Sequence, residues 1–271
     1  MEAKRLAVFG VSGRMGQSIL RVLRQEMRWR LSGALASPQS TSLGRDAAGV
    51  GTPLGVLITA DPAAALVDAQ GHKADVAVDF SSAAAVAPHA QACAAAGVPL
   101  LVGTTALQGD CLETLKLAAK SIPVLLAPNT SVGVGVLAEL VRVAARALPP
   151  DFDVEIHEAH HRMKRDAPSG TALKLGEAVA QARSQQLAEV AVYDRHGAHA
   201  AREPGSIGFS VVRAGDIVGE HTVIFAGAGE RLEITHRATD RDVFARGALE
   251  AAEWLADRSP GTYSMQDVLR R

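Results

Sequence analysis

The residues best suited to chemistry gather between Glu155 and Leu173. This stretch holds three histidines, two arginines and a lysine on what reads as one strand and one loop, and it then enters a helix through Pro-Ser-Gly-Thr. Histidine transfers protons near neutral pH, while lysine and arginine bind carboxylates. A helix N-terminus preceded by small hydroxyl residues binds a carboxylate as well. The stretch therefore predicts a small dianionic substrate and a proton-coupled reduction.

A glycine-rich turn near the N-terminus is the second candidate site. Leu6–Gly16 places an apolar strand, three glycines and a helix start in direct succession. Glycines let the backbone approach a pyrophosphate, and the free N–H groups and positive dipole of the helix end favour its charge. The spacing is G-x-x-G-x-x-G rather than G-x-G-x-x-G, so a tight turn without a ligand stays an alternative. The residues expected to bind a dinucleotide here are Gly10, Val11, Ser12, Gly13, Arg14 and Met15.

The end of the second predicted strand bears on the choice between NADH and NADPH. In NAD-binding proteins an Asp or Glu at this place holds the ribose hydroxyls. Here the strand runs into Leu35–Pro38, which contains no carboxylate and no arginine. Without the acid there is no repulsion against a 2′-phosphate. The sequence therefore predicts NADPH or NADH, with a mild preference for NADPH.

The first half of the chain alternates short apolar runs with helical patterns. Continuous apolar runs are typical of strands buried on both faces of a parallel sheet, and their alternation with helices indicates a doubly wound α/β fold. The predicted strands are Leu6–Phe9, Leu31–Ala36, Val56–Thr59, Val76–Phe80, Leu100–Val102 and Val124–Ala127. The predicted helices follow the glycine turn and cover Ala83–Ala96 and Leu112–Ala119.

The pattern changes after Asn129. We expect helices over Val132–Ala147, after Pro168 and over Val243–Ala256, and strands over Asp153–His161, Ile207–Arg213, Ile217–Ala226 and Arg231–Arg237. Short turns at residues 214–216 and 227–229 predict antiparallel neighbours. The fold class is thus a Rossmann-like doubly wound parallel sheet plus a second α+β domain with a mostly antiparallel sheet. We place a dinucleotide-binding domain at 1–130, with 241–271 returning to it, and a substrate-binding and oligomerisation domain at 131–240.

Composition and charge exclude several classes of function. The 271 residues carry a net charge of −1, which gives no general attraction to nucleic acid or anionic membranes. The two cysteines lack metal-ligand spacing and are expected to be structural. The apolar run Leu6–Gly10 is too short for a signal peptide, and no run of ~20 apolar residues follows. We expect a cytoplasmic protein.

Several segments together carry a resemblance to a known family. Glu158–Ala172, which reads E-A-H-H-R-x-K-x-D-A-P-S-G-T-A, resembles the signature of the dihydrodipicolinate reductases. Gly10–Gly16 is similar to the family's G-x-x-G-R-M-G turn. Four more segments, at 102–105, 127–134, 214–221 and 229–236, resemble family segments in the same order. The resemblance thus covers nearly the whole chain.

The resemblance implies a reaction and roles for named residues. The reaction is NAD(P)H-dependent reduction of 4-hydroxy-tetrahydrodipicolinate, through dihydrodipicolinate, to tetrahydrodipicolinate, on the route to diaminopimelate and lysine. His160 would be the acid/base residue, Lys164 a proton donor or polarising cation, and His161, Gly170 and Thr171 would bind the substrate carboxylates. The loops implied beside the nicotinamide are Gly103, Thr104, Thr105, Ala127, Pro128, Asn129 and Thr130. Family members are usually homotetramers.

This chain departs from the family pattern on the cofactor side. Ala36-Ser37 stands where members have an acidic residue followed by arginine, and Ser82 stands where many have arginine. Thr130 takes the place of a phenylalanine. These departures leave the choice of cofactor and the packing of its ring open, and they do not touch the segment from His160 to Thr171.

Two other classes of function compete with the reductase. His157-Glu158-x-x-His161 matches the H-E-x-x-H motif of zinc hydrolases, which needs a helix to bring both histidines to one metal. A non-catalytic nucleotide- or nucleic-acid-binding protein could use the basic loop at 160–165, although no aromatic residues are interleaved there. The other histidines are expected to be surface or packed residues: His72, His89, His196, His199, His221 and His236.

Overall fold

The computed structural model describes residues 2–49, 51–197 and 201–270 and divides the chain into two compact units. Unit 1 comprises the residues up to Val132 together with those from Asp242 onward, and unit 2 comprises Gly133–Arg241. The C-terminal segment therefore belongs to the same unit as the N-terminal strands. His199 lies outside the described residues.

Unit 1 is built on one seven-stranded sheet with the order β12-β6-β5-β4-β1-β2-β3. Every ladder in it is parallel. The strands are β1 (Lys4–Phe9), β2 (Trp29–Leu35), β3 (Ile58–Thr59), β4 (Val76–Asp79), β5 (Leu100–Val102), β6 (Pro123–Leu126) and β12 (Gly261–Ser264). All residues of β4 and β5 are buried, as the continuous apolar runs predict.

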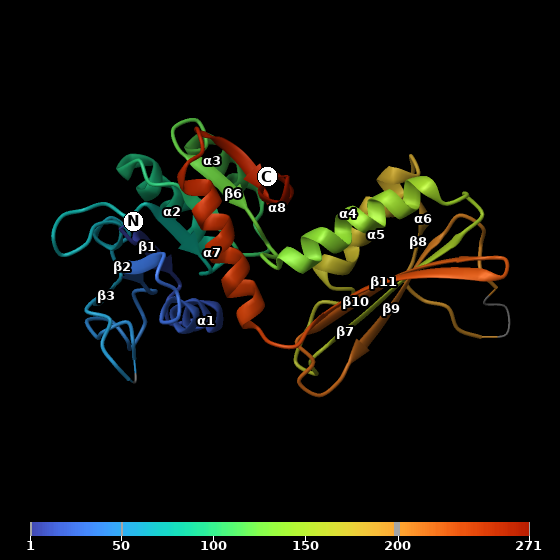
Figure 1. Ribbon diagram of the computed structural model, residues 1–271, viewed down its shortest axis with the longest axis horizontal. Coiled ribbons are helices and arrows are strands. Elements are labelled where there is room, and N and C mark those ends of the chain that lie inside the picture. Colours follow the sequence, from blue (N-terminus) through green and yellow to red (C-terminus); the bar gives the residue numbers. More distant parts are fainter. Residues whose placement is uncertain (1, 50, 198–200, 271) are drawn as a thin grey trace. The chain divides into compact units, whose positions relative to one another are not determined.

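Helices cover both faces of this sheet (Figure 1). They are α1 (Arg14–Leu23), α2 (Ala83–Ala96), α3 (Gly109–Ala118), α7 (Asp242–Ala256), α8 (Met265–Leu269) and the short 3-10 helix η1 (Ala64–Leu66). Residues of α1, α7 and α8 share one core with the sheet, and residues of η1, α2 and α3 share the other. The Rossmann-like doubly wound fold is confirmed.

Unit 2 contains a five-stranded sheet with the order β11-β10-β7-β9-β8. Its strands are β7 (Asp153–His160), β8 (Ala191–Val192), β9 (Ile207–Arg213), β10 (Gly219–Gly227) and β11 (Glu230–Ala238). The central strand β7 pairs antiparallel with β10 and parallel with β9. The hairpin of β10 and β11 is antiparallel, as its short turn predicts. The sheet is therefore mixed rather than mostly antiparallel.

The prediction that β9 and β10 are neighbours is wrong, because β7 lies between them. The connection at residues 214–218 crosses the end of β7, where the Ala214 N–H donates to the His160 carbonyl at 2.9 Å. Two inter-strand spacings amount to roughly 10 Å, which five residues span easily. A short connection restricts the distance between two strands but does not make them hydrogen-bonded partners.

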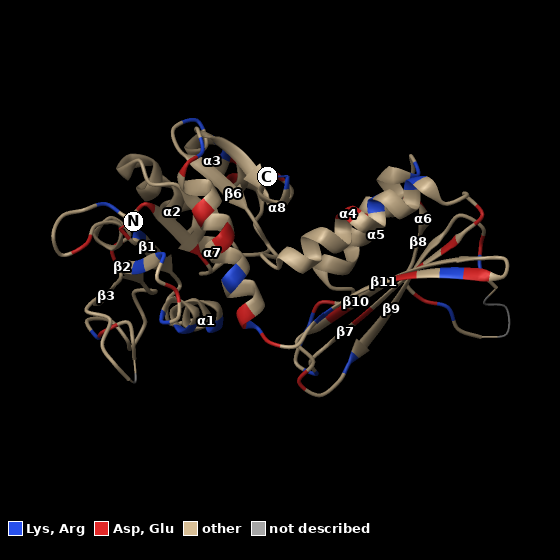
Figure 2. Cartoon of the chain, in the orientation of Figure 1, with Lys and Arg blue, Asp and Glu red and all other residues tan. Residues whose placement is uncertain are grey.

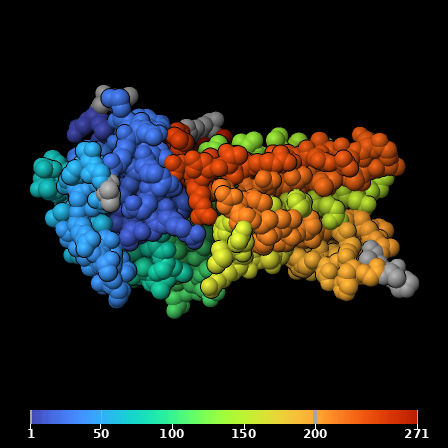
Figure 3. Space-filling model, turned by 90° about the horizontal axis from the view of Figure 1, so that it is seen from below, coloured from blue at the N-terminus to red at the C-terminus, as the bar shows by residue number. Residues whose placement is uncertain are grey.

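Helices cover one face of the second sheet. They are α4 (Val132–Ala147), α5 (Gly170–Ala182) and the short α6 (Leu187–Val190). Their apolar residues form one core with the strands, in which Leu137 of α4 and Val179 of α5 join Val154 and Ile156 of β7. The edge strand β11 is mostly exposed and lies open on the surface in red-orange in Figure 3. Across the described part of the chain, no helix has the length and apolar character needed to span a membrane.

Candidate active site

The loops predicted to hold a dinucleotide all follow strands of the parallel sheet. Gly10–Met15 follows β1, Gly103–Thr105 follows β5 and Ala127–Thr130 follows β6. Because the strands are parallel, these loops share the carboxyl edge, where ligands of open α/β sheets bind. The fold of unit 1 thus brings the predicted cofactor residues together at one edge.

The glycine turn has the geometry that a pyrophosphate cradle requires. Gly10 adopts a φ of +78°, and a Cβ atom there would lie 2.5 Å from the Phe80 carbonyl oxygen. A Cβ atom on Gly16 would lie 2.5 Å from the Gly10 carbonyl oxygen. Gly13 precedes α1 as its N-cap residue, in an extended conformation and without a side-chain cap, and Arg14, the first residue of the helix, is exposed. The bare helix start therefore fits a phosphate group.

The loop after β2 offers no acid for ribose hydroxyls. Ala36 is buried, and its N–H donates to the Thr59 carbonyl at 3.0 Å, while Ser37 is exposed. Asp46, further along the loop, accepts hydrogen bonds from the Ala48, Leu54 and Gly55 amides. Its carboxylate is thus engaged with its own loop.

Thr130, which stands where the family resemblance led us to expect phenylalanine, contacts helix α7. Its side chain is buried, and its hydroxyl donates to the Phe244 carbonyl of α7 at 2.7 Å. A Cβ atom on Gly247 would lie 1.9 Å from the Thr130 carbonyl oxygen, so α7 packs directly on this loop. Thr130 therefore joins the loop after β6 to the returning helix.

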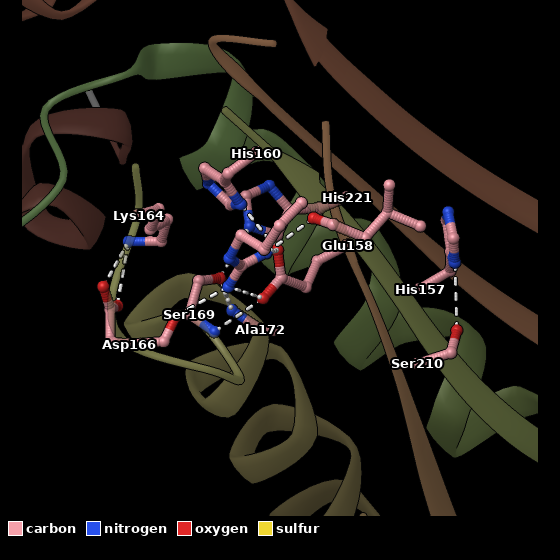
Figure 4. Close-up of polar contacts among 11 residues, drawn as sticks. His157, Glu158, His160, Lys164, Asp166, Ser169, Ala172, Ser210 and His221 are labelled. Carbon is pink, nitrogen blue, oxygen red and sulfur yellow. Dashed lines mark hydrogen bonds and ion pairs between the residues drawn. The ribbon is translucent and has the colours of Figure 1, made fainter. Parts of the chain in front are cut away.

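The alternation of β7 decides which polar side chains face the helices of unit 2. Val154, Ile156, Glu158 and His160 are buried on the covered face. His157 points the opposite way, and its Nδ1 lies 2.9 Å from the Ser210 hydroxyl (Figure 4). An apolar strand with period two thus ends in two buried ionisable residues.

Glu158 is the centre of a buried hydrogen-bond network. Its Oε2 lies 2.5 Å from Nδ1 of His160, and both its oxygens accept from the Arg213 guanidinium at 2.8 Å. The Ser169 N–H donates to Oε1 at 2.8 Å. Burial alone would raise the pKa of Glu158, but the hydrogen bonds from His160, Arg213 and Ser169 outweigh burial and lower the pKa to about 2.

His221 of β10 extends the network from the neighbouring strand. Its Nε2 lies 3.1 Å from the Ser169 hydroxyl, and its ring centroid is 5.2 Å from that of His160 (Figure 4). Nδ1 is buried and has no hydrogen-bond partner within the described ranges 2–49, 51–197 and 201–270. Burial, and then the charge of His160, lower the pKa of His221 to about 4.

Sequence reasoning missed Glu158, Arg213 and His221 as parts of this network. His221 was grouped with the packed histidines, and it is indeed buried. The sequence did contain a signal for the burial of His221. His221 lies at two-residue spacing from Val223 and Phe225, and in β10 these three residues are buried on the same face. No comparable signal identifies Arg213, which reaches Glu158 across a strand pairing that the sequence does not predict.

The remaining predicted residues lie around the same end of β7. The Lys164 ammonium contacts both oxygens of Asp166, at 2.9 and 2.8 Å (Figure 4), and the Asp166 carbonyl accepts from Arg213 of the Glu158 network at 2.6 Å. Ser169 caps α5 by accepting from the Ala172 N–H at 3.2 Å. His161 and Thr171 are partly exposed, and Gly170, the first residue of α5, is exposed. An imidazole, an ammonium group and a helix N-terminus therefore all belong to this end of unit 2.

The zinc-hydrolase alternative fails on geometry. His157 lies on strand β7 and His161 follows the end of that strand, whereas the motif requires both histidines one turn apart on the same face of a helix. Among the described residues no group of three or more His, Cys, Asp or Glu side chains could hold a metal ion. Figure 2 shows acidic and basic residues interspersed over both units, which gives no support to the nucleic-acid alternative.

The parallel sheet with its glycine turn, together with a second unit that contains a buried histidine network, defines the chain as a Rossmann-type oxidoreductase. Comparisons with known proteins agree. The model of the family described as dihydrodipicolinate reductase, N-terminus, matches residues 4–130, and that of the C-terminus matches residues 133–269.

Individual relatives match over nearly their full lengths. A 4-hydroxy-tetrahydrodipicolinate reductase of Anaeromyxobacter dehalogenans is 50% identical over 267 residues, covering 98% of this chain and 97% of the relative. That of Nitrosomonas eutropha is 48% identical over 270 residues, covering 99% of both. A dipicolinate-bound dihydrodipicolinate reductase from Paenisporosarcina has the same fold, with a TM-score of 0.76, 22% identity and coverage of 98% and 99%. The chain belongs to the dihydrodipicolinate reductase family.

Proposed function

We propose that this chain catalyses the NAD(P)H-dependent reduction of 4-hydroxy-tetrahydrodipicolinate, through dihydrodipicolinate, to tetrahydrodipicolinate in diaminopimelate and lysine biosynthesis. The observation that carries the proposal is the identity of about half of all residues with reductases of this name over nearly their whole length. The glycine cradle of unit 1 and the buried Glu158–His160 pair of unit 2 fit the two tasks of such an enzyme.

The substrate is a small dicarboxylate. The related structure with bound dipicolinate supports this class of ligand. His161, Lys164, Gly170 and Thr171 bind its carboxylates: Gly170 and Thr171 begin α5, whose N-terminal dipole favours negative charge, and His161 and Lys164 stand on the loop between β7 and α5. Lys164 donates to Asp166 and has three N–H donors, so it turns at least one of them to a substrate carboxylate.

His160 is the proton-transferring residue, with Lys164 as the second cation. Since the Glu158 carboxylate accepts a hydrogen bond at Nδ1, the proton of His160 lies on Nδ1 and Nε2 is the atom that faces the reaction. Glu158 thereby fixes the tautomer and orientation of the ring. Gly219 leaves room for it, because a Cβ atom there would lie 3.1 Å from Nε2.

The reduced nicotinamide, when bound, supplies the hydride. Gly10–Met15 hold the pyrophosphate, and Gly103–Thr105 with Ala127–Thr130 bind the nicotinamide half. NADPH is mildly preferred over NADH, because residues 36–38, which directly follow β2, carry no carboxylate to repel a 2′-phosphate.

The protein is cytoplasmic and assembles as a homotetramer through unit 2. The open edge strand β11 supports this assembly, because an edge strand offers unpaired backbone groups to another chain. Further support for this assembly comes from apolar residues of the same sheet that are exposed, namely Val211, Val212 and Leu232.

An assay with enzymatically generated 4-hydroxy-tetrahydrodipicolinate tests the function. We expect oxidation of NADPH and of NADH that depends on substrate, with a higher kcat/KM for NADPH. No oxidation of either cofactor would overturn the proposed function, whereas a higher kcat/KM with NADH would overturn only the cofactor preference.

A further inference from the structure

Unit 1 contains a buried polar cluster that the proposed mechanism does not use. Asp79 ends β4 and is fully buried, and His89 of α2 is 8% exposed. Nδ1 of His89 lies 2.7 Å from Oδ2 of Asp79. A buried carboxylate is tolerated only where donors surround it, so such a cluster has to be assembled completely.

The second carboxylate oxygen of Asp79 joins the cluster to a loop that follows another strand. Oδ1 accepts from the Ser81 N–H at 2.9 Å, the Ser81 hydroxyl at 2.6 Å and the Thr104 hydroxyl at 3.1 Å. The Asp79 carbonyl accepts from the Gly103 and Thr104 amides at 2.8 and 3.1 Å. The backbone N–H and the hydroxyl of Thr104 are therefore both engaged with Asp79.

The loop held in this way continues into exposed and strained backbone. Thr104 is buried, but Thr105 is exposed. Ala106 has a φ of +60°, which is unfavourable for a residue with a Cβ atom and persists only where neighbouring structure fixes it. An anchor at Thr104 thus sets where Thr105 lies.

Close packing joins the same segment to the glycine turn. A Cβ atom on Gly103 would lie 2.0 Å from Cε1 of Phe80, and a Cβ atom on Gly10 would lie 2.5 Å from the Phe80 carbonyl oxygen. Residues 79–81 therefore touch two of the three loops at the carboxyl edge. A shift at Asp79 would move both.

We propose that Asp79 and His89 are positioning residues for the dinucleotide: they anchor Thr104, so that Thr105 and the following backbone meet the nicotinamide half. In this assignment Thr104 is a structural link and Thr105 is the contact residue. The inference rests on the proposed function, because it takes the ligand of this edge to be NAD(P)H.

Two substitutions of His89 distinguish its role as a hydrogen-bond donor to Asp79 from its role as a packed side chain. His89→Asn keeps a donor at the place of Nδ1, whereas His89→Leu removes it and retains an apolar side chain. Thr104→Val leaves the Asp79–His89 hydrogen bond intact, so it still tests the proposal if His89→Leu does not fold. The measurements are the Kd for NADPH by cofactor fluorescence and amide hydrogen exchange of the ligand-free protein.

We expect His89→Leu and Thr104→Val each to weaken NADPH binding about five- to tenfold, the effect of one lost hydrogen bond. Combining them should weaken binding little further, since both break the same link. His89→Asn should bind nearly as the wild type does. In the ligand-free protein, the Gly103 and Thr104 amides should exchange faster in His89→Leu.

Different failures point to different claims. A wild-type protein that binds no NADPH would overturn the proposed function and this inference with it. Wild-type binding with unchanged Kd and unchanged exchange in His89→Leu and Thr104→Val would overturn the inference alone. A His89→Asn variant that binds as poorly as His89→Leu would also contradict it, because the donor would then be irrelevant.

Discussion

Glu158 keeps its charge inside unit 2 because an imidazole, a guanidinium and a backbone amide all donate to it. An uncompensated carboxylate in that position would cost several kcal/mol. The arrangement makes Glu158 dependent on Arg213 and Ser169, and it makes the orientation of His160 dependent on Glu158. If His160 transfers protons as proposed, its function therefore depends on Glu158, Arg213 and Ser169 as well.

Replacing Glu158 by glutamine tests this dependence. Glu158→Gln has nearly the same shape but lacks the charge that fixes the Nδ1–H tautomer of His160. Turnover should fall about 10- to 100-fold, since a positioned acid/base group contributes roughly 10²- to 10⁴-fold. The KM for substrate should change little. Steady-state kinetics check this, with Glu113→Gln on the exposed surface of α3 as the control expected to match the wild type.

His221 predicts a pH dependence of stability. Its pKa is lowered to about 4 in the folded protein from 6.5, so between these values the unfolded chain binds a proton that the folded protein does not. The free energy of unfolding should therefore fall as the pH drops through this window, by up to about 3 kcal/mol. Above pH 6.5 the contribution of His221 is constant.

Urea unfolding at pH 7.5 and pH 5 measures this effect. His221→Gln retains a polar atom toward the Ser169 hydroxyl but cannot titrate. The variant should lose less stability than the wild type between the two pH values. Equal losses in both proteins would show that His221 does not carry the pH dependence.

Single residues were predictable where a motif has its own chemistry. Gly10–Met15 and the segment from His160 to Thr171 could be found from residue types and spacing. Glu158 was visible only as part of a motif, and Arg213 could not be found, because its contact depends on β9 lying beside β7. Contacts between distant segments require the sheet order, which local patterns do not provide.

The start of strand β10 limits the space available to the His160 imidazole on the neighbouring strand β7. β10 begins at Gly219, which lies against the His160 ring, where a Cβ atom would be 3.1 Å from Nε2. That distance is shorter than a relaxed contact, so a methyl group there must shift the imidazole by a few tenths of an ångström. The start of one strand thus controls the position of a side chain on its neighbour.

Gly219→Ala should lower turnover about tenfold while the protein stays folded. The reason is that a displaced imidazole loses alignment with the substrate; a shift of about 1 Å would cost about 100-fold, and the smaller shift expected here costs less. The KM for NADPH should be unchanged, because the substitution lies in unit 2. Crystallography of the variant would locate the ring, and an unmoved ring with normal turnover would refute the steric argument.

Among the elements, buried helices and strands with strong apolar patterns were predicted well. The bounds of α2, β5 and α4 agree with the prediction. Strand β12 was missed, because Gly261–Ser264 has no apolar run and is a strand only through pairing with β6. The order of β9 and β10 was wrong for a related reason, since turn length does not determine pairing.

At the scale of the whole molecule, the chain leaves its first unit and returns to it. Helix α7 packs on α1 and on the loop at Thr130, while β12 extends the parallel sheet beside β6. The prediction that residues from 241 onward rejoin the first domain was drawn from resemblance to relatives. Local sequence patterns contain no information about such a return.

The proposed homotetramer predicts a molecular mass four times that of the chain. Light scattering after size-exclusion chromatography should give this value at micromolar concentration. Leu232→Lys, which places a charge on the exposed strand β11, should shift the protein to smaller species, because charged residues prevent association of sheet edges. A monomeric wild-type protein would contradict the proposed assembly and leave the fold unaffected.

The central claim is that unit 1 binds the dinucleotide while His160 and Lys164 of unit 2 carry out proton transfer and substrate polarisation. The most direct test is a His160→Gln, Lys164→Ala double variant, in which the Kd for NADPH and the turnover are measured on the same preparation. We predict an unchanged Kd and a turnover reduced by at least about 10²-fold. Turnover close to that of the wild type would contradict the account.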